Sequence, residues 1–106
     1  MSKIIAVDFD GTLCQNQFPN IGKPNYNVIV KLKAEKFRGS RIILWTCRNG
    51  LQLQEAVDWC NMYDIHFDAV NQNLPDVIAY YGGDTRKIVA DEYWDDKAVN
   101  INTFFK

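Results

Sequence analysis

The sequence lacks the features that mark secreted, membrane-spanning and disulfide-rich proteins. It has no apolar run near the roughly 18 residues of a membrane-spanning helix, and the apolar stretch after Lys3 ends before Asp8, too short for the apolar region of a secretory signal. Cysteine is scarce: Cys14, Cys47 and Cys60 are odd in number and have no paired or metal-ligand spacing. We therefore expect reduced thiols, no membrane partner and a cytoplasmic protein.

The sequence also lacks an excess of either charge. Its 12 basic and 13 acidic residues give a formal net charge of −1, so no overall field attracts nucleic acid. There are no internal repeats and no low-complexity segments. With 106 residues, 47% of them hydrophobic, the chain is expected to form a single globular domain over residues 1–106.

What the sequence does contain is an alternation of strand-like and helix-like segments. The strand-like segments are short, apolar and rich in β-branched residues, which is typical of strands buried on both faces of a parallel sheet. The helix-like segments repeat apolar residues at helical spacing. The expected strands are 3–7, 41–45, 66–70 and 88–94, and the expected helices are 25–37, 51–63 and a short one starting at Leu74-Pro75. This order predicts an α/β fold, a three-layer Rossmann-like arrangement around a mainly parallel central sheet.

Two aspartates follow the first expected strand. Asp8 and Asp10 are two residues apart, so both side chains point the same way if the extended geometry persists. Two carboxylates 4 Å apart repel by about 4 kcal/mol at an effective dielectric constant near 20, so a cation is expected between them. Gly11 permits a sharp turn close to a ligand, and Thr12 offers a hydroxyl or an amide donor.

The second expected strand ends in a group of residues suited to an anion. Thr46, Cys47 and Arg48 directly precede the helix 51–63. A hydroxyl, a guanidinium and helix-start amides at one strand end fit an anionic oxygen such as phosphate. Asn49 has a simpler interpretation, as the cap of that helix.

More acids follow the last expected strand. Asp95 and Asp96 lie level with Asp8 and Asp10 if the two strands are neighbours. Four carboxylates around one point imply a hard divalent cation, and Mg²⁺ prefers oxygen ligands and is commonly shared with phosphate. Asp91 is an alternative metal-site acid, with Asp95 as its partner. We favour Asp95 and Asp96 and expect Asp91 to be a structural carboxylate.

Four sequence elements taken together resemble a known family. They are VDFDGTL at the first strand end, LWT at the second, a lysine before the last strand, and WDD after it. In this order they resemble the haloacid dehalogenase-like (HAD) phosphohydrolase superfamily over Val7 to Asp96. The resemblance implies a magnesium-dependent phosphatase in which Asp8 forms an aspartyl-phosphate. Asp10 would protonate the leaving oxygen and then activate water.

The resemblance also implies roles for the remaining site residues. Thr46 would hold a phosphoryl oxygen, and Lys87, with Arg86 as the nearby alternative, would neutralise the nucleophile and the phosphate. The magnesium site would consist of Asp8, the Asp10 backbone carbonyl, Asp95 and Asp96. The remaining phosphate-contacting residues are expected to be Gly11, Thr12, Cys47 and Arg48.

No segment is long enough for the cap domain of larger relatives. A capless site is open to solvent, which suits a bulky phosphorylated substrate, such as a nucleotide or a macromolecule, unless a second subunit covers it in a homo-oligomer. Phe18 could stack on a base and Lys23 could meet a phosphate, or Phe18 and Ile21 could simply anchor their loop. Two other functions remain open: a receiver-like phospho-acceptor and a binding-only HAD domain.

Overall fold

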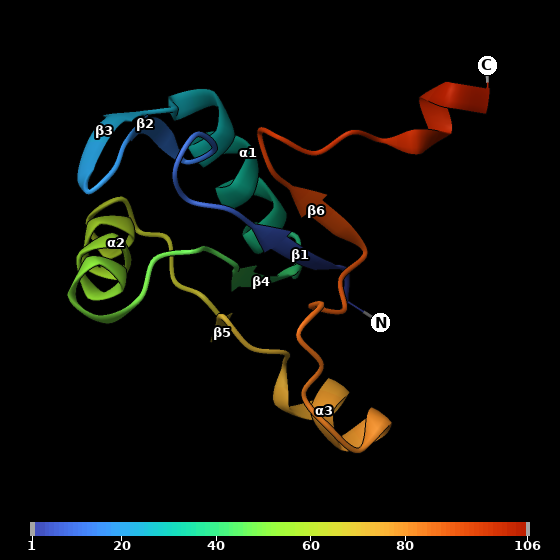
Figure 1. Ribbon diagram of the computed structural model, residues 1–106. Helices are drawn as coiled ribbons and strands as arrows, with labels where there is room; N and C mark the ends of the chain where they lie inside the picture. The colour runs from blue at the N-terminus through green and yellow to red at the C-terminus, as the bar shows by residue number, and fades with distance from the viewer. Residues whose placement is uncertain (1, 106) are drawn as a thin grey trace.

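A four-stranded parallel sheet lies at the centre of the computed structural model, which describes residues 2–105 (Figure 1). Its strands are β1 (Ile4–Val7), β4 (Arg41–Leu44), β5 (Ala69–Val70) and β6 (Glu92–Trp94), in the order β5-β4-β1-β6. Val7, the last residue of β1, pairs with Leu44 on one side and with Trp94 on the other. The carboxyl ends of three strands therefore meet at one edge of the sheet.

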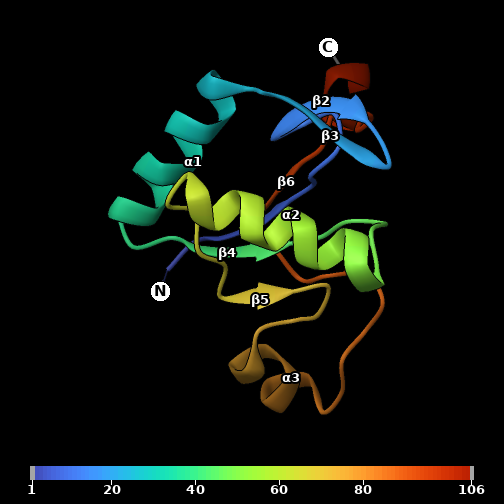
Figure 2. The ribbon, with the colours of Figure 1, turned by 90° about the vertical axis from the view of Figure 1, so that its left-hand side faces the viewer.

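Three helices make the outer layers of the fold. They are α1 (Tyr26–Phe37), α2 (Gly50–Met62) and α3 (Pro75–Tyr81). Figures 1 and 2 show α1 and α2 on one face of the sheet and the shorter α3 on the other. The predicted three-layer α/β fold without a cap domain is confirmed for residues 2–105. None of the helices in this range combines the length and the apolar character needed to cross a bilayer.

Each face of the sheet has its own apolar core. Side chains alternate along β1, so Ile5 and Val7 face α1 and α2 while Ala6 faces α3. The core under α1 and α2 is the larger one, and it includes Leu32 of α1 and Cys60 of α2. Both helix faces were predicted from their apolar spacing. At the carboxyl end of α1, however, Phe37 is 94% exposed.

The segment after β1 forms a β-hairpin that the sequence did not predict. Its strands are β2 (Cys14–Gln17) and β3 (Asn20–Pro24), which pair antiparallel. Gly22 is required where β3 passes close to β2, because a Cβ added to it would lie 2.8 Å from the carbonyl carbon of Gln15. The hairpin stands at the same edge of the molecule as the carboxyl ends of the strands (Figure 1).

The last expected strand is shorter than predicted. Residues 88–94 were expected to be one strand, but β6 begins only at Glu92. Asp91 is the reason: its carboxylate accepts a 2.7 Å hydrogen bond from the Ile4 backbone N–H, and its own N–H donates to the Ile4 carbonyl. Asp91 is thus the structural carboxylate that we expected, and it fixes the start of β1.

Candidate active site

Three carboxylates converge at the carboxyl edge of the sheet. Ligand oxygens of Asp8, Asp95 and Asp96 all lie within 4.8 Å of one another. Asp8 is placed by a 2.9 Å hydrogen bond from its N–H to the Trp94 carbonyl, which extends the β1–β6 pairing by one residue. The sequence predicted this convergence, and it depends on β1 and β6 being neighbours.

Gly11 and Thr12 hold Asp96 in this cluster. Gly11 has a φ of +86°, and a Cβ added to it would lie 2.7 Å from the Asp96 side-chain carbon. The Thr12 hydroxyl accepts a 3.1 Å hydrogen bond from the Asp96 backbone N–H. Both residues are therefore seen in contact with an acid of the cluster, and their expected contact with phosphate stays a prediction.

Burial and the neighbouring carboxylates disfavour the ionised form of Asp8 in the absence of a cation. Burial raises the pKa of Asp8 from 3.8 to about 6, and the charges of Asp95, Asp96 and Asp10 act in the same direction. In residues 2–105 no basic side chain lies within 4.0 Å of Asp8, Asp95 or Asp96. The cluster is thus all-oxygen, negative and unneutralised, which is the donor set that a hard divalent cation requires.

The end of β4 places Thr46 beside the cluster. The Trp45 N–H donates to the Val7 carbonyl at 2.9 Å, so the residues after β4 run alongside Asp8. Thr46 is fixed by Asn71, whose side-chain oxygen accepts from the Thr46 N–H at 2.8 Å. Asn71 has a φ of +53° and follows β5 directly. No sequence pattern selects Asn71, because its role depends on β5 lying next to β4.

Cys47 and Asn49 lie just before α2, where Asn49 takes the predicted cap position and the contact of Cys47 with phosphate stays a prediction. Cys47 is exposed, so it is accessible to a ligand. Asn49 occupies the N-cap position of α2 but makes no side-chain capping hydrogen bond.

Arg48 is not available to bind phosphate, which corrects the sequence prediction. The residue is only 2% exposed, and all five N–H donors of its guanidinium are used. Nε and Nη2 donate to the two carboxylate oxygens of Asp10 at 2.8 Å each. The other donors bind backbone carbonyls of Pro19, Asn20 and Gln52.

Asp10 therefore lies next to the acid cluster without belonging to it. Its carboxylate is paired with Arg48, and this contact raises the pKa of Arg48. The expected contribution of Asp10 to a metal site, through its backbone carbonyl, stays a prediction.

Lys87 and Asp8 line the same cavity, of about 200 Å³. The Lys87 ammonium lies 5.9 Å from the centroid of the Tyr93 ring instead of against a carboxylate. Asn73, which is 1% exposed, holds the segment that carries Lys87. Its side chain donates to Asp84 and accepts from the Val89 N–H at 2.8 Å.

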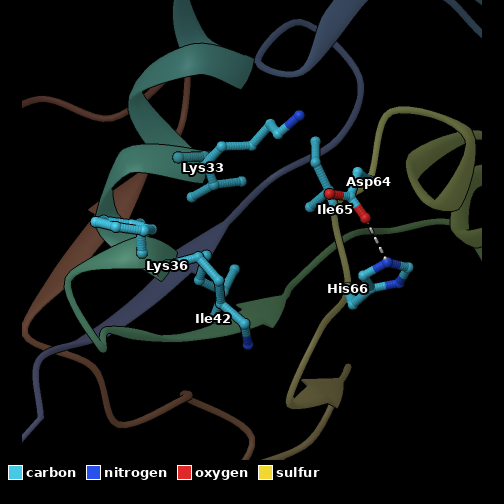
Figure 3. A pocket seen from close by; sticks show the side chains of 8 residues that line it. Lys33, Lys36, Ile42, Asp64, Ile65 and His66 are labelled. Atoms are coloured by element: carbon cyan, nitrogen blue, oxygen red, sulfur yellow. Dashed lines mark hydrogen bonds and ion pairs between the residues drawn. The ribbon is translucent and has the colours of Figure 1, made fainter.

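Two larger cavities lie away from the cluster. One, of about 320 Å³, is bordered by Lys33, Lys36, Ile42, Asp64, Ile65 and His66 (Figure 3). The ring nitrogens of His66 lie 2.9 Å from Asn61 and 3.0 Å from Asp64. The other, of about 880 Å³, lies under α3 beside Tyr80 and Tyr81. Of the acids considered from the sequence for the metal site, only Asp91 borders either cavity, the larger one, and there it is the structural carboxylate bonded to Ile4.

The hairpin brings Phe18 to the site while Ile21 anchors it. Ile21 packs against the core under α1 and α2. Phe18 is 58% exposed, and its ring centroid lies 5.1 Å from the Arg48 guanidinium carbon. Lys23 is exposed, and its contact with substrate stays a prediction.

No protein-family model and no curated protein matches the chain. Among solved structures, it is similar to one described as the structure of the conserved protein coded by locus from Bacteroides thetaiotaomicron. The two chains are 36% identical, and the match has a TM-score of 0.83 and covers 93% of this chain and 79% of that chain. This chain therefore belongs to the same family as that conserved Bacteroides protein.

Proposed function

We propose that this chain is a magnesium-dependent HAD-type phosphohydrolase that cleaves phosphate monoesters through an aspartyl-phosphate on Asp8. One observation carries the proposal: Asp8 and the adjacent pair Asp95 and Asp96, which is far from Asp8 in the sequence, present oxygens within 4.8 Å of one another at the carboxyl edge of a parallel sheet. Ligand sites of open α/β sheets lie at this edge.

The acid cluster fits Mg²⁺ by the chemistry of its donors. Asp8, Asp95 and Asp96 would hold the ion, with substrate oxygens and water completing its coordination. Bound there, Mg²⁺ would neutralise charge on the phosphoryl group. Lys87, in the same cavity, would add a second positive charge, and Thr46 would donate to a phosphoryl oxygen.

The reaction would proceed in two displacements. In the first, an Asp8 oxygen bonds to phosphorus as the ester P–O bond breaks, and the leaving oxygen takes a proton from Asp10. In the second, water attacks the phosphorus of the aspartyl-phosphate, Asp10 takes the proton of that water, and Asp8 is released as the carboxylate. Phosphate is the product, and Asp10 regains the proton that it gave.

The open site favours a substrate larger than a sugar phosphate, such as a nucleotide or a phosphorylated macromolecule. Phe18, exposed at the hairpin tip, would offer a face on which a base can stack. Alternatively, a second subunit in a homo-oligomer would cover the open site. It is supported by the carboxyl-terminal segment, which leaves the domain directly after Asp96 and ends in a 3₁₀-helix (Ile101–Phe105) with Phe104 and Phe105 exposed (Figure 1).

Phosphate release from p-nitrophenyl phosphate tests the proposal. We expect activity that requires Mg²⁺, that is abolished in Asp8→Asn, and that falls by about 10²–10⁴-fold in Asp10→Asn, the range for loss of a general acid–base group. Asp58→Asn, which changes an exposed aspartate of α2, is the matched control and should retain full activity. Full activity in Asp8→Asn would contradict the covalent mechanism. A panel of sugar phosphates, nucleotides and 3′- and 5′-phosphorylated oligonucleotides would then identify the substrate class.

A further inference from the structure

The Arg48 guanidinium, which is distant from both in the sequence, joins Asp10 to the tip of the β2–β3 hairpin. It contacts Asp10, after β1, through two 2.8 Å hydrogen bonds. It also donates to the carbonyls of Pro19 and Asn20 at the tip of the β2–β3 hairpin, at 3.2 and 3.0 Å. The α2 segment supplies the fifth acceptor, the Gln52 carbonyl.

Two aromatic rings complete the surroundings of this guanidinium. Its central carbon lies 5.0 Å from the Phe9 ring centroid and 5.1 Å from that of Phe18. Stacking on ring faces and fork-shaped pairing with a carboxylate are both properties of arginine that lysine does not reproduce. The site is therefore specific for arginine and not merely for a positive charge.

We infer that Arg48 is a positioning residue, which fixes the Asp10 carboxylate in the orientation from which it exchanges a proton with the leaving group and links that orientation to the hairpin tip. The inference rests on the proposed function, because it assumes that Asp10 is the general acid–base. It assigns to Arg48 a task other than binding the phosphate.

Asp10 keeps the capacity to act in this arrangement. Each of its oxygens uses one lone pair for Arg48, and a carboxylate has about four lone-pair positions in all. Its side chain is 16% exposed, so it is not closed off from the site. Arg48, with a side-chain exposure of 1%, lies on the protein side of the pair. Arg48 thus restricts rotation of the carboxylate while leaving part of it accessible.

The two substrates that test this inference differ in how much their leaving group needs a proton. p-Nitrophenolate departs readily without one, whereas the alkoxide of β-glycerol phosphate requires one. As the ester bond breaks and the Asp8–phosphorus bond forms, the proton passes from Asp10 to the alkyl oxygen. Misplacing Asp10 should therefore slow the alkyl ester selectively.

The experiment compares kcat/KM for both substrates in wild type, Arg48→Lys, Asp10→Asn and the double variant. We expect Arg48→Lys to lower the value for β-glycerol phosphate by about 10–100-fold, the cost of a misplaced catalytic group, and that for p-nitrophenyl phosphate by less than about threefold. In the Asp10→Asn background, Arg48→Lys should change kcat/KM for either substrate by less than about twofold, because the effects of substituting two groups that act as one unit are not additive.

Arg41→Lys is the matched control. Arg41 pairs with Asp76 at 2.7 Å near the amino ends of the strands. The same substitution there should leave unchanged the ratio of kcat/KM for β-glycerol phosphate to kcat/KM for p-nitrophenyl phosphate. If Arg48→Lys does not fold, Phe18→Ala provides the test, since it removes only an exposed ring from the guanidinium. It should lower the same ratio to a smaller extent, and this effect too should vanish in the Asp10→Asn background.

The outcomes separate the two proposals. A wild-type chain without magnesium-dependent phosphatase activity would overturn the proposed function, and this inference with it. An active wild type in which Arg48→Lys, or Phe18→Ala in its place, slows both substrates equally and still does so in the Asp10→Asn background would overturn the inference alone. That result would assign Arg48 to stability only.

Discussion

Replacing Asp8 by Asn should stabilise the folded chain in the absence of Mg²⁺. In the folded state Asp8 is half-buried and close to Asp95 and Asp96, and its pKa rises from 3.8 to about 6. The folded state therefore binds the proton of Asp8 more tightly than the unfolded state does. The stability associated with this group is fully present below pH 3.8 and is lost as the pH rises through about 6.

The size of the effect follows from the two pKa values. The difference between 3.8 and about 6 corresponds to about 3 kcal/mol above pH 6. Because the side chain is only half-buried, solvent screening reduces this to about 1–1.5 kcal/mol. For a domain of this size that is about 5–10 °C in the thermal unfolding midpoint.

The assay is urea or thermal unfolding of wild type and Asp8→Asn in EDTA between pH 4 and 7.5. We expect a difference near zero at pH 4 that grows in favour of Asp8→Asn up to pH 7, and that shrinks when Mg²⁺ is added to stabilise the wild type. Asp58→Asn should show no such trend. If Asp8→Asn is less stable than wild type at pH 7.5 in EDTA, burial and the neighbouring carboxylates do not disfavour the charged form of Asp8 as the geometry requires.

Three further changes test the parts around the cluster. Gly11→Ala should lower the free energy of unfolding by about 1–3 kcal/mol more than Gly82→Ala, because both glycines have a positive φ but only at Gly11 would the new Cβ strike Asp96; equal losses in urea unfolding would contradict this. Asn73→Ala should lower the free energy of unfolding by at least about 2 kcal/mol by leaving buried groups unpaired, and it should also reduce kcat. A loss of stability without any loss of kcat would show that the Lys87 segment is not needed for activity. Adding Mg²⁺ at about 100 times its dissociation constant should stabilise the wild type by about 2.7 kcal/mol; a similar rise in the thermal midpoint of an Asp95→Asn, Asp96→Asn double variant would place the ion elsewhere.

The parts of the fold and site that were predictable are those that short sequence segments specify. Apolar runs without alternation indicated the strands at 3–7 and 41–45; Asp8 follows the first of them, and Asp95 and Asp96 follow the segment 88–94, which was also expected to be a strand. Once the strands are neighbours, no further information is needed to bring these acids together. The apolar spacing of α2 likewise indicated its buried face, on which Ala56 and Cys60 lie.

The parts that were missed depend on contacts between distant segments. The residues of β2, CQNQ, have no apolar alternation, so only pairing with β3 reveals a strand. The strand expected from Ile88 starts four residues later, because Asp91 instead bonds to the start of β1. Arg48 was interpreted as a phosphate ligand because a basic residue at a strand end suits an anion. Its actual anion is Asp10, which sequence spacing could not indicate.

Phosphorylation of Asp8 itself tests the central claim most directly. The chain would be mixed with p-nitrophenyl phosphate and Mg²⁺, quenched in acid within the first turnover, and digested for mass spectrometry of the peptide that contains residues 4–23. A phosphoryl group on Asp8, dependent on Mg²⁺ and absent in Asp8→Asn, is the result that the account predicts. Magnesium-dependent phosphate release of equal rate in wild type and Asp8→Asn, with no phosphorylated peptide, would contradict it.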